Sequence, residues 1–338
     1  MPIPYALLRA GFPYLKTVGM RRVIDYPVDV AITDDLRVFS LCRLEGTAKI
    51  ARVAWEDDAN LGDIGSTGSG DGQFTWPSQM ILDCEQNLVI SDEALHRITF
   101  LTTGGDFVSS WGDHGTGDGE LNAPSGIALD IEENLYVADS MNHRVQKFTK
   151  DGKFMLNWGK FGRNPSQFNI PWGIDVDEQN YVYVSDWRND RIQKFTSDGE
   201  FVFEIGVSGI ENGEFNRPAG ISVDKDGDIY VADSGNNRVQ LFNPEGRYID
   251  KFIGDADLSI SGRAYLLANA KPLRLRDMAN IEPQKRLRSP RSVRVDMDGR
   301  MFIADYGSFR VQVYQKDAIP LSEEDIVEMP RSPTLQVT

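Results

Sequence analysis

Acid–arginine pairs at a fixed spacing are the most regular charged feature of the sequence. In five places an aspartate is followed five residues later by an arginine. A carboxylate beside a guanidinium could act as a general acid or hold an ionic substrate, but a catalytic pair is needed only once. A hairpin with a four-residue loop places its two flanking residues opposite one another in every copy. We therefore expect a structural role in fixing these loops for Asp92 and Arg97, Asp139 and Arg144, Asp186 and Arg191, Asp233 and Arg238, and Asp305 and Arg310.

These pairs belong to a longer unit that the chain repeats. The unit is clearest from Pro124 to Lys150, with the sequence PSGIALDIEENLYVADSMNHRVQKFTK. Further copies begin at Pro77, Pro171, Pro218 and Pro290, and a degenerate copy begins at Pro27, so that successive prolines lie 50, 47, 47, 47 and 72 residues apart. This period is typical of one four-stranded propeller blade, with an insertion in the last interval.

The apolar pattern inside the unit predicts four short strands. Ile127 and Leu129 lie two residues apart, as do Leu135 and Val137, and a polar turn separates the two runs. Further strands are expected at residues 144–148 and, after an Asp-Gly turn, at 154–158. The predicted fold is all-β: a six-bladed β-propeller of four-stranded antiparallel blades.

The consensus of the copies is specific. The phrases P-x-G-I-x-V-D, N/D-x-Y-V-A-D, N-x-R-V-Q-x-F and D-G-x-F, in this order, resemble the NHL repeat over residues 14 to 316. The resemblance implies a six-bladed propeller that serves mostly as a binding platform, with one enzymatic branch, the peptidyl-hydroxyglycine amidating lyases. Function does not follow from this fold alone, because one fold hosts many functions.

The two ends of the chain indicate how the ring closes. Residues 14–19 resemble the fourth-strand phrase of residues 154–159, whereas the last copy lacks such a phrase of its own. We expect the N-terminal strand to complete the sixth blade and to remove two exposed sheet edges. Residues 1–316 would then form a single domain, and residues 317–338 an acidic C-terminal tail that is mobile or lies extended over the surface.

An insertion at about residues 255–289 interrupts the period between the fifth and sixth blades. Ser259 or Ser261 can cap a helix over residues 263–270. From Asp255 to Arg294 there are nine basic and four acidic residues, a net charge of +5, so the rest of the chain carries −20. The segment either clamps onto the acidic ring or serves as a lid or docking element for an acidic partner.

Composition restricts partners and location. The net charge of −15, from 36 basic and 51 acidic residues, disfavours binding of phosphate backbones and anionic membranes through the bulk surface. Cys42 and Cys84 fall in different blades without metal-site spacing, which predicts buried free thiols. No apolar run reaches 18 residues and the first 22 residues do not form a secretion signal, so we expect a cytoplasmic protein without membrane insertion.

Recognition is expected where the copies differ, at the mouth of the central channel. The residue after each repeat proline should line this mouth, and the residue after each loop aspartate should lie beside it. Tryptophan and tyrosine next to arginine are common anchors of binding sites. The expected partner-binding residues are Trp172, Trp187, Arg188, Arg286, Arg288, Arg291 and Tyr306. The alternative is that Trp172 plugs the channel and Trp187 packs on the next blade.

Enzymatic readings fit the sequence less well. The resemblance to the lyases would require histidines that converge on the channel to hold zinc, but His96, His114 and His143 all lie outside the predicted mouth positions. The related sugar-lactonase propellers use a carboxylate-rich metal site, for which only Asp29 is available near the mouth. We expect no catalytic residues, metal site or cofactor.

The expected function is a non-catalytic scaffold. Its partner would be a protein or peptide, including an acidic one, with a small-molecule ligand as an option and nucleic acid disfavoured. A hydrolase or lyase that uses Asp29 and Arg291 at the channel mouth is the alternative, and RNA binding through the basic insertion is a second one.

Overall fold

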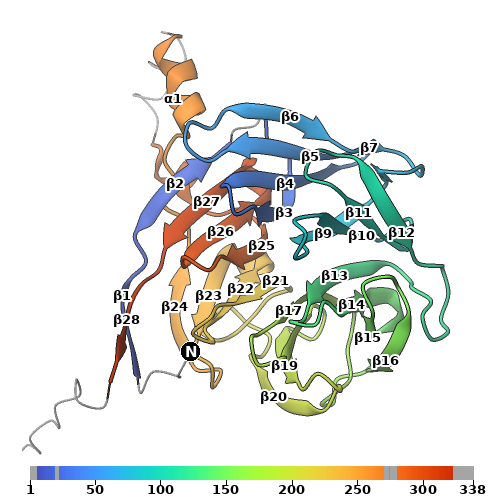
Figure 1. Ribbon diagram of the computed structural model, residues 1–338. Helices are drawn as coiled ribbons and strands as arrows, with labels where there is room; N and C mark the ends of the chain where they lie inside the picture. Colours follow the sequence, from blue (N-terminus) through green and yellow to red (C-terminus); the bar gives the residue numbers. More distant parts are fainter. Residues whose placement is uncertain (1–5, 20–22, 270–273, 275–279, 323–338) are drawn as a thin grey trace, which may run out of the picture.

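The computed structural model describes residues 6–19, 23–269, 274 and 280–322. These residues form six four-stranded antiparallel sheets arranged as blades around a central channel (Figure 1). In blades 1 to 5 the strands follow the order of the chain from the channel outward, and each first strand begins at a repeat proline. The predicted six-bladed β-propeller is confirmed.

Blades 2 to 5 have identical strand lengths, whereas the second and third strands of blade 1 are longer. Blade 1 contains β3 (Pro27–Ile32), β4 (Arg37–Leu44), β5 (Thr47–Ala54) and β6 (Asn60–Ile64); blade 2 contains β9 (Pro77–Leu82), β10 (Leu88–Asp92), β11 (Arg97–Leu101) and β12 (Phe107–Trp111). Blade 3 contains β13 (Pro124–Leu129), β14 (Leu135–Asp139), β15 (Arg144–Phe148) and β16 (Phe154–Trp158); blade 4 contains β17 (Pro171–Val176), β18 (Val182–Asp186), β19 (Arg191–Phe195) and β20 (Phe201–Ile205). Blade 5 contains β21 (Pro218–Val223), β22 (Ile229–Asp233), β23 (Arg238–Phe242) and β24 (Tyr248–Phe252).

Blade 6 joins the two ends of the chain. Its inner strands are β25 (Pro290–Val295), β26 (Arg300–Asp305) and β27 (Arg310–Gln315), and its outermost strand is β2 (Tyr14–Val18), which pairs antiparallel with β27. The N-terminal strand therefore closes the ring, as predicted. The first residues of the expected tail form β28 (Asp317–Leu321), which pairs with β1 (Ala6–Gly11) in a ribbon outside the ring; residues 323–338 of that tail lie outside the described residues.

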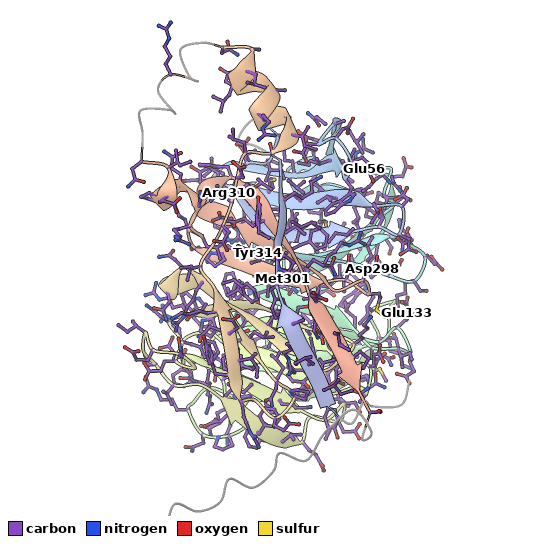
Figure 2. The ribbon with its side chains drawn as sticks, turned by 90° about the vertical axis from the view of Figure 1, so that its left-hand side faces the viewer. Glu56, Glu133, Asp298, Met301, Arg310 and Tyr314 are labelled. Atoms are coloured by element: carbon purple, nitrogen blue, oxygen red, sulfur yellow. The ribbon has the colours of Figure 1, made fainter. Side chains whose placement is uncertain are left out.

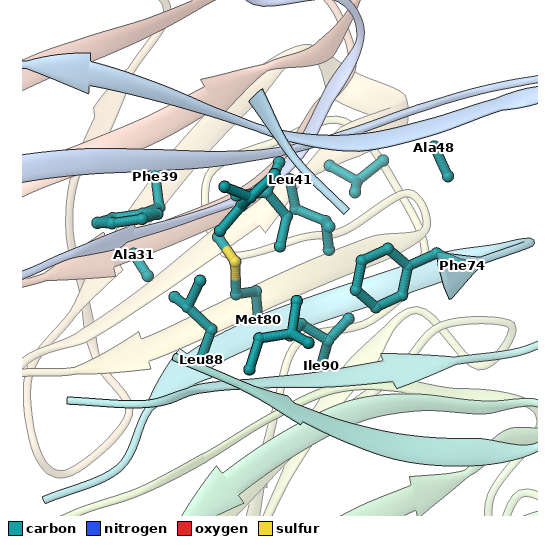
Figure 3. Close-up of a cluster of buried hydrophobic side chains, with 12 residues drawn as sticks. Ala31, Phe39, Leu41, Ala48, Phe74, Met80, Leu88 and Ile90 are labelled. Carbon is teal, nitrogen blue, oxygen red and sulfur yellow. The ribbon is translucent and has the colours of Figure 1, made fainter. Parts of the chain in front are cut away.

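The hydrophobic core is divided among the blade interfaces. Each of the six interfaces between neighbouring blades holds one cluster of buried apolar side chains within the described part of the chain. Figure 3 shows the cluster between blades 1 and 2, where Phe39 and Leu41 face Met80, Leu88 and Ile90. Burial of each such side chain stabilises the fold by about 1.5–3 kcal/mol, so the stability of the ring is distributed around it.

The insertion is built onto an ordinary blade connector. Leu287 N–H donates to Ile253 O at 2.9 Å, just as Phe168 N–H donates to Lys160 O in the connector before blade 4. Between these ends the chain forms α1 (Ile260–Leu267), whose N-cap is Ser259, and α3 (Glu282–Lys285). In Figures 1 and 2, α1 stands outside the ring near blade 6, at the end opposite the β1–β28 ribbon.

Both cysteines are free thiols, but their burial differs. Cys42 is buried at the end of β4 and Cys84 is exposed in the turn after β9. The expectation that both are buried was wrong for Cys84, because its turn lies at the surface where β9 and β10 meet.

Candidate binding site at the channel mouth

The wall of the channel is held together by polar side chains that reach from one blade to the next. Asp29 accepts from Met80 N–H at 2.9 Å, and Gln79 Oε1 accepts from Ile127 N–H at 2.8 Å. Contacts of the same kind, with donor–acceptor distances between 2.7 and 3.2 Å, join Ser125 to Trp172, Asp175 to Val223, and Ser222 to Val295. The circle ends with Arg294, whose Nη2 lies 2.7 Å from Asp29 Oδ2. Polar groups of the wall therefore stabilise the ring.

The channel is also narrow. The repeat glycines let the first strands approach closely, since a Cβ at Gly126 would lie 2.3 Å from Trp172 O and one at Gly220 would lie 2.6 Å from Ser292 Cα. The cavity just below the mouth, lined by Trp172 and Arg291 among others, has a volume of about 10 Å³. This is about the space that one water molecule requires. A ligand larger than a small group must therefore bind on the mouth.

The acid–arginine pairs fix the loops on the mouth face. The pairs in blades 3 to 6 form ion pairs between arginine Nε and the aspartate, at 2.7–3.0 Å. The same arginines donate to carbonyl groups of the preceding connector, as Arg144 does to Gly117 O and Glu120 O. Each pair thus ties the loop between the second and third strands to the connector, and places both on one face.

Blade 2 differs from this arrangement. Asp92 and Arg97 lie opposite each other in the sheet, but within the described ranges they form no ion pair. Asp92 accepts from the backbone N–H groups of Thr75 and Trp76, and Arg97 donates to carbonyls of the connector, including Gln73 O. The direct pairing that we expected from the spacing is therefore absent here, because the two side chains turn to separate backbone partners.

Two histidines join neighbouring blades on the same face. His96 Nδ1 accepts from Ala123 N–H at 3.0 Å, and His143 Nδ1 accepts from Ile170 N–H at 3.1 Å. Burial lowers the pKa of both imidazoles. In the next blades the same position is filled by Asp190 and Asn237, whose side-chain oxygens accept the corresponding N–H groups. The histidines are therefore acceptors in a repeated contact.

Blade 4 brings two tryptophans together at the mouth. The rings of Trp172 and Trp187 are half-buried, with centroids 6.0 Å apart and planes inclined by 33°. Two exposed guanidinium groups lie over Trp187, that of Arg188 at 5.6 Å and that of Arg217 at 5.2 Å from the ring centroid. Within the described parts of the chain neither arginine has a carboxylate within ion-pair distance. This arrangement can bind an apolar or aromatic group beside an anionic one.

The other mouth residues expected from the sequence lie in blade 6. The Arg291 guanidinium lies 5.1 Å from the ring centroid of Tyr306, and both residues are half-buried. Burial lowers the pKa of Arg291, and the nearby Arg43 lowers it further. Arg43 itself is paired with Glu93 at 3.0 Å, while burial raises the pKa of Glu93. Positive charge therefore gathers at the mouth of an acidic protein.

Arg286 and Arg288 lie at the end of the insertion, where it rejoins the ring. Arg286 donates to Gly254 O at 2.9 Å and lies 3.6 Å from Asp255. Arg288 has an exposed side chain, and its backbone N–H donates to Asp305 at 2.7 Å. The base of the insertion lies on the face of the loops, since Arg310 donates to the carbonyls of residues 284–286.

The helix of the insertion lies away from the mouth. A groove of about 400 Å³ separates α1 from β2. The residues that line it include Leu15 and Thr17 of β2 and Ile260 and Leu267 of α1. Ile260 N–H donates to Asp58 in the turn between β5 and β6. The described helix of the insertion therefore packs beside the outer edge of blade 6, and it does not act as a cover over the tryptophans of blade 4.

Sequence reasoning missed two residues of this region. The predicted mouth positions follow each repeat proline, whereas Arg217 stands immediately before Pro218. Asp175 lies four residues after Pro171, deep in the wall, and burial raises its pKa to about 6. The repeat register could have identified Arg217 by its place beside the repeat proline. It could not have identified Asp175, because the same offset in blades 1 to 3 is occupied by residues of the apolar clusters between blades, Ala31, Ile81 and Ala128.

No group of three or more His, Cys, Asp or Glu side chains in the described residues has an arrangement that could hold a metal ion. No helix in the same residues is both long and apolar enough to cross a membrane.

Comparison with known proteins identifies the repeat. Residues 121–148, 168–195 and 215–242 match the model of the NHL repeat. No curated protein matches the sequence. Similar solved structures include a structural genomics protein of unknown function from Bacteroides thetaiotaomicron, with 16% identity, a TM-score of 0.62, and coverage of 92% of this chain and 77% of that one.

Two further similar structures are those of named proteins. A gluconolactonase from Xanthomonas campestris shares 13% identity at a TM-score of 0.58, covering 93% of this chain and 98% of that one. The WD40 propeller domain of Doa1 shares 14% identity at a TM-score of 0.56, covering 91% and 98%. At these identities the likeness shows the fold alone. The chain therefore contains three NHL repeats and folds as a six-bladed β-propeller.

Proposed function

We propose that the protein is a non-catalytic scaffold that binds a protein or peptide on its channel-mouth face, centred on blade 4. The observation that carries this proposal is the pair of half-buried tryptophans, Trp172 and Trp187, with two arginines over the outer ring and no carboxylate to neutralise them in the described chain. Aromatic side chains and arginine are the residues that dominate binding energy at protein interfaces.

The surroundings of the tryptophans favour an extended partner. The blade 4 loop is bonded to the connector on each side, through Asn189 to Gly162 O and through Asp190 to Ser208. Those two connectors expose large apolar side chains: Phe161 is 65% exposed, Val207 62% and Ile210 71%. Apolar groups on both sides of an aromatic and basic centre suit a peptide that crosses blade 4.

The proposal is tested by selecting binding peptides from a random decapeptide display library on the immobilised full chain. We expect enrichment on the wild type that Trp187→Ala abolishes. The control is Ile131→Ala, which removes an exposed apolar side chain from the opposite face and should leave enrichment intact. Equal enrichment on the wild type and on Trp187→Ala would overturn the proposal.

The enzymatic alternative makes a different prediction. Its candidate acid, Asp29, is fully buried and is held by Arg294 and by the backbone N–H groups of Val30 and Met80. A carboxylate with these partners is poorly placed to move protons or to bind a substrate. Stoichiometric metal in the purified protein, together with lactone hydrolysis that is lost in Asp29→Asn, would favour this alternative. Metal-free protein that retains a selected peptide would favour the scaffold.

The cellular location is a separate part of the proposal. We place the protein in the cytoplasm, where the exposed Cys84 would remain a thiol. A blocking reagent that modifies Cys84 in intact cells only after permeabilisation would agree with this location.

A further inference from the structure

Arg291 differs from every residue at the same position in the other blades. The corresponding residues are Val28, Ser78, Ser125, Trp172 and Ala219, none of which carries a charge. Within the described residues, Arg291 has no carboxylate at ion-pair distance, and its Nε–H is buried without a hydrogen-bond partner. A buried donor without a partner has lost its hydrogen bonds to water and gained none in return, and this cost is greater when the donor is charged. A ligand with a hydrogen-bond acceptor could therefore bind to the Arg291 Nε–H, which has no partner in the folded chain.

The immediate surroundings of Arg291 form a small polar recess. The neighbouring Ser292 Oγ is also buried without a partner, and both residues line the cavity of about 10 Å³ below the mouth. Tyr306 covers one side of the guanidinium. Arg43 and Arg217 add positive potential. The nearby Glu93 is already bonded to Arg43, and Asp29, which lines the same cavity, is paired with Arg294. The recess thus has unused donors, a positive field and room for little more than one oxygen atom.

We propose that Arg291 binds one carboxylate group of the peptide partner, so that one carboxylate oxygen enters the recess while the adjoining residue lies on Trp172 and Trp187. This inference rests on the proposed function and names the chemical class of its ligand. A planar guanidinium pairs with a planar carboxylate through two parallel hydrogen bonds. The size of the recess favours a carboxylate over a phosphate, whose three terminal oxygens require more space. The carboxylate belongs either to an Asp or Glu side chain or to a chain terminus.

The first test uses direct observation of the guanidinium. The full chain labelled with ¹⁵N-arginine is titrated with sodium acetate against sodium chloride at equal ionic strength. The Nε signal of Arg291, assigned by its absence in Arg291→Met, should shift saturably with acetate. Inorganic phosphate should act more weakly. No shift with acetate, or a larger and tighter shift with phosphate, would overturn the carboxylate assignment. This arm needs no peptide, so it gives an answer even if the proposed scaffold function fails.

The second test uses the decapeptides selected on the full chain. Each peptide is compared with variants in which a single Asp or Glu is changed to Asn or Gln, or the C-terminus is amidated. The change that lowers the affinity identifies the source of the carboxylate. We expect one change to weaken binding about tenfold or more, the range of a charge-assisted hydrogen-bond pair. Arg291→Met should weaken the parent peptide by the same factor and the neutralised peptide hardly at all.

The control for that second test is Arg247→Met. Arg247 is an exposed arginine in the turn between β23 and β24, on the opposite face, and its change should leave every affinity unaltered. Unchanged thermal melting of Arg291→Met would show that folding is intact. Selected peptides that bind Arg291→Met as tightly as the wild type would overturn the inference and leave the scaffold function standing. Failure to select any peptide would count against the scaffold function alone.

Discussion

The wall and the mouth of the channel are built from neighbouring positions of the same six strands, yet their polar side chains are used in opposite ways. In the wall, Asp29, Gln79 and Asp175 bond to the next blade, and Arg294 closes the circle. At the mouth, Arg217 and Arg291 have no carboxylate partner among the described residues. In β25, three positions separate Arg294, which holds the ring together, from Arg291, which is free to bind.

This difference shows where variation between repeats carries function. A wall position must supply an acceptor or donor at a place that the next blade dictates, so its side chain is determined by the fold. Of the residues that follow the repeat prolines, those of blades 4 and 6, Trp172 and Arg291, are partly exposed, whereas the other four are buried. Trp172 and Arg291 have no such obligation, because the loops of their blades are already held by acid–arginine pairs. The charged side chains of the wall are therefore explained by their contribution to stability, whereas those of the mouth are better explained by the binding of a ligand.

The largest effect is expected from breaking the wall. Arg294→Met would leave Asp29 buried without its counter-ion, which lowers the free energy of unfolding by about 3–5 kcal/mol. Thermal and urea denaturation measure the loss. The double variant Asp29→Asn with Arg294→Met should recover much of it, since the uncompensated charge is gone. A single variant as stable as the wild type would contradict the role of the wall.

At the mouth we expect a loss of binding without a loss of stability. Trp187→Ala should weaken a selected peptide by roughly 1–3 kcal/mol, because an aromatic anchor and its contacts with Arg188 and Arg217 are removed. Arg288→Glu should act in the same direction and range, as it reverses an exposed charge on the same face. Fluorescence polarisation gives the affinity and calorimetry the melting temperature. A large drop in melting temperature would show that Trp187 stabilises the core and is not mainly a binding residue.

The sequence predicted the fold because the repeat states it many times. Six copies of one pattern give the number of blades, and the unmatched phrase at Tyr14 gives the closure onto β27. These features are local, or follow from the need to pair every sheet edge. The cross-blade bonds of the wall could not be predicted, because they depend on which side chains of adjacent strands meet after the blades have packed.

The site was predicted in outline and its details were not. The register of the repeat placed Trp172 near Trp187, and Arg291 near Tyr306. Charge patterning suggested a basic lid, but the described helix α1 packs on the edge of blade 6, where Tyr14 and Asp58 bond to the segment that leads into it. An insertion has no repeat register, so its position depends on tertiary contacts that the sequence pattern does not encode.

One wall residue, Asp175, should destabilise the fold near neutral pH. Burial raises the pKa of Asp175 to about 6, so the folded protein holds this proton at a pH where the unfolded chain, with a pKa near 3.8, has released it. Stability from this group is therefore lost as the pH rises from about 4 through 6. Asp175→Asn keeps an acceptor for Val223 N–H and should be about 1–2 kcal/mol more stable than the wild type at pH 7, and no more stable at pH 4. Denaturation at the two pH values measures this, and an equal difference at both would show that the carboxylate does not titrate there.

The smallest effect concerns the contacts between neighbouring blades on the mouth face, in which His143 accepts from Ile170 N–H. Burial lowers the pKa of this imidazole, with Asp139 opposing the shift. The unfolded chain therefore takes up a proton before the folded protein does. The sign is the reverse of that for Asp175: stability from His143 is present above a pH of about 6.5 and is lost as the pH falls below it, since a protonated Nδ1 cannot accept the bond.

The chain supplies the matched variant for this last prediction. In blade 5 the same contact is made by Asn237, whose Oδ1 accepts from Ser289 N–H at 2.7 Å and does not titrate. His143→Asn should therefore melt like the wild type at pH 7.5 and be more stable, by less than about 1 kcal/mol, at pH 5.5. Its peptide affinity should be unchanged at both pH values if the contact belongs to the framework. A change in affinity that follows the protonation of His143 would instead extend the binding site from the mouth of blade 4 into the contact between blades 3 and 4.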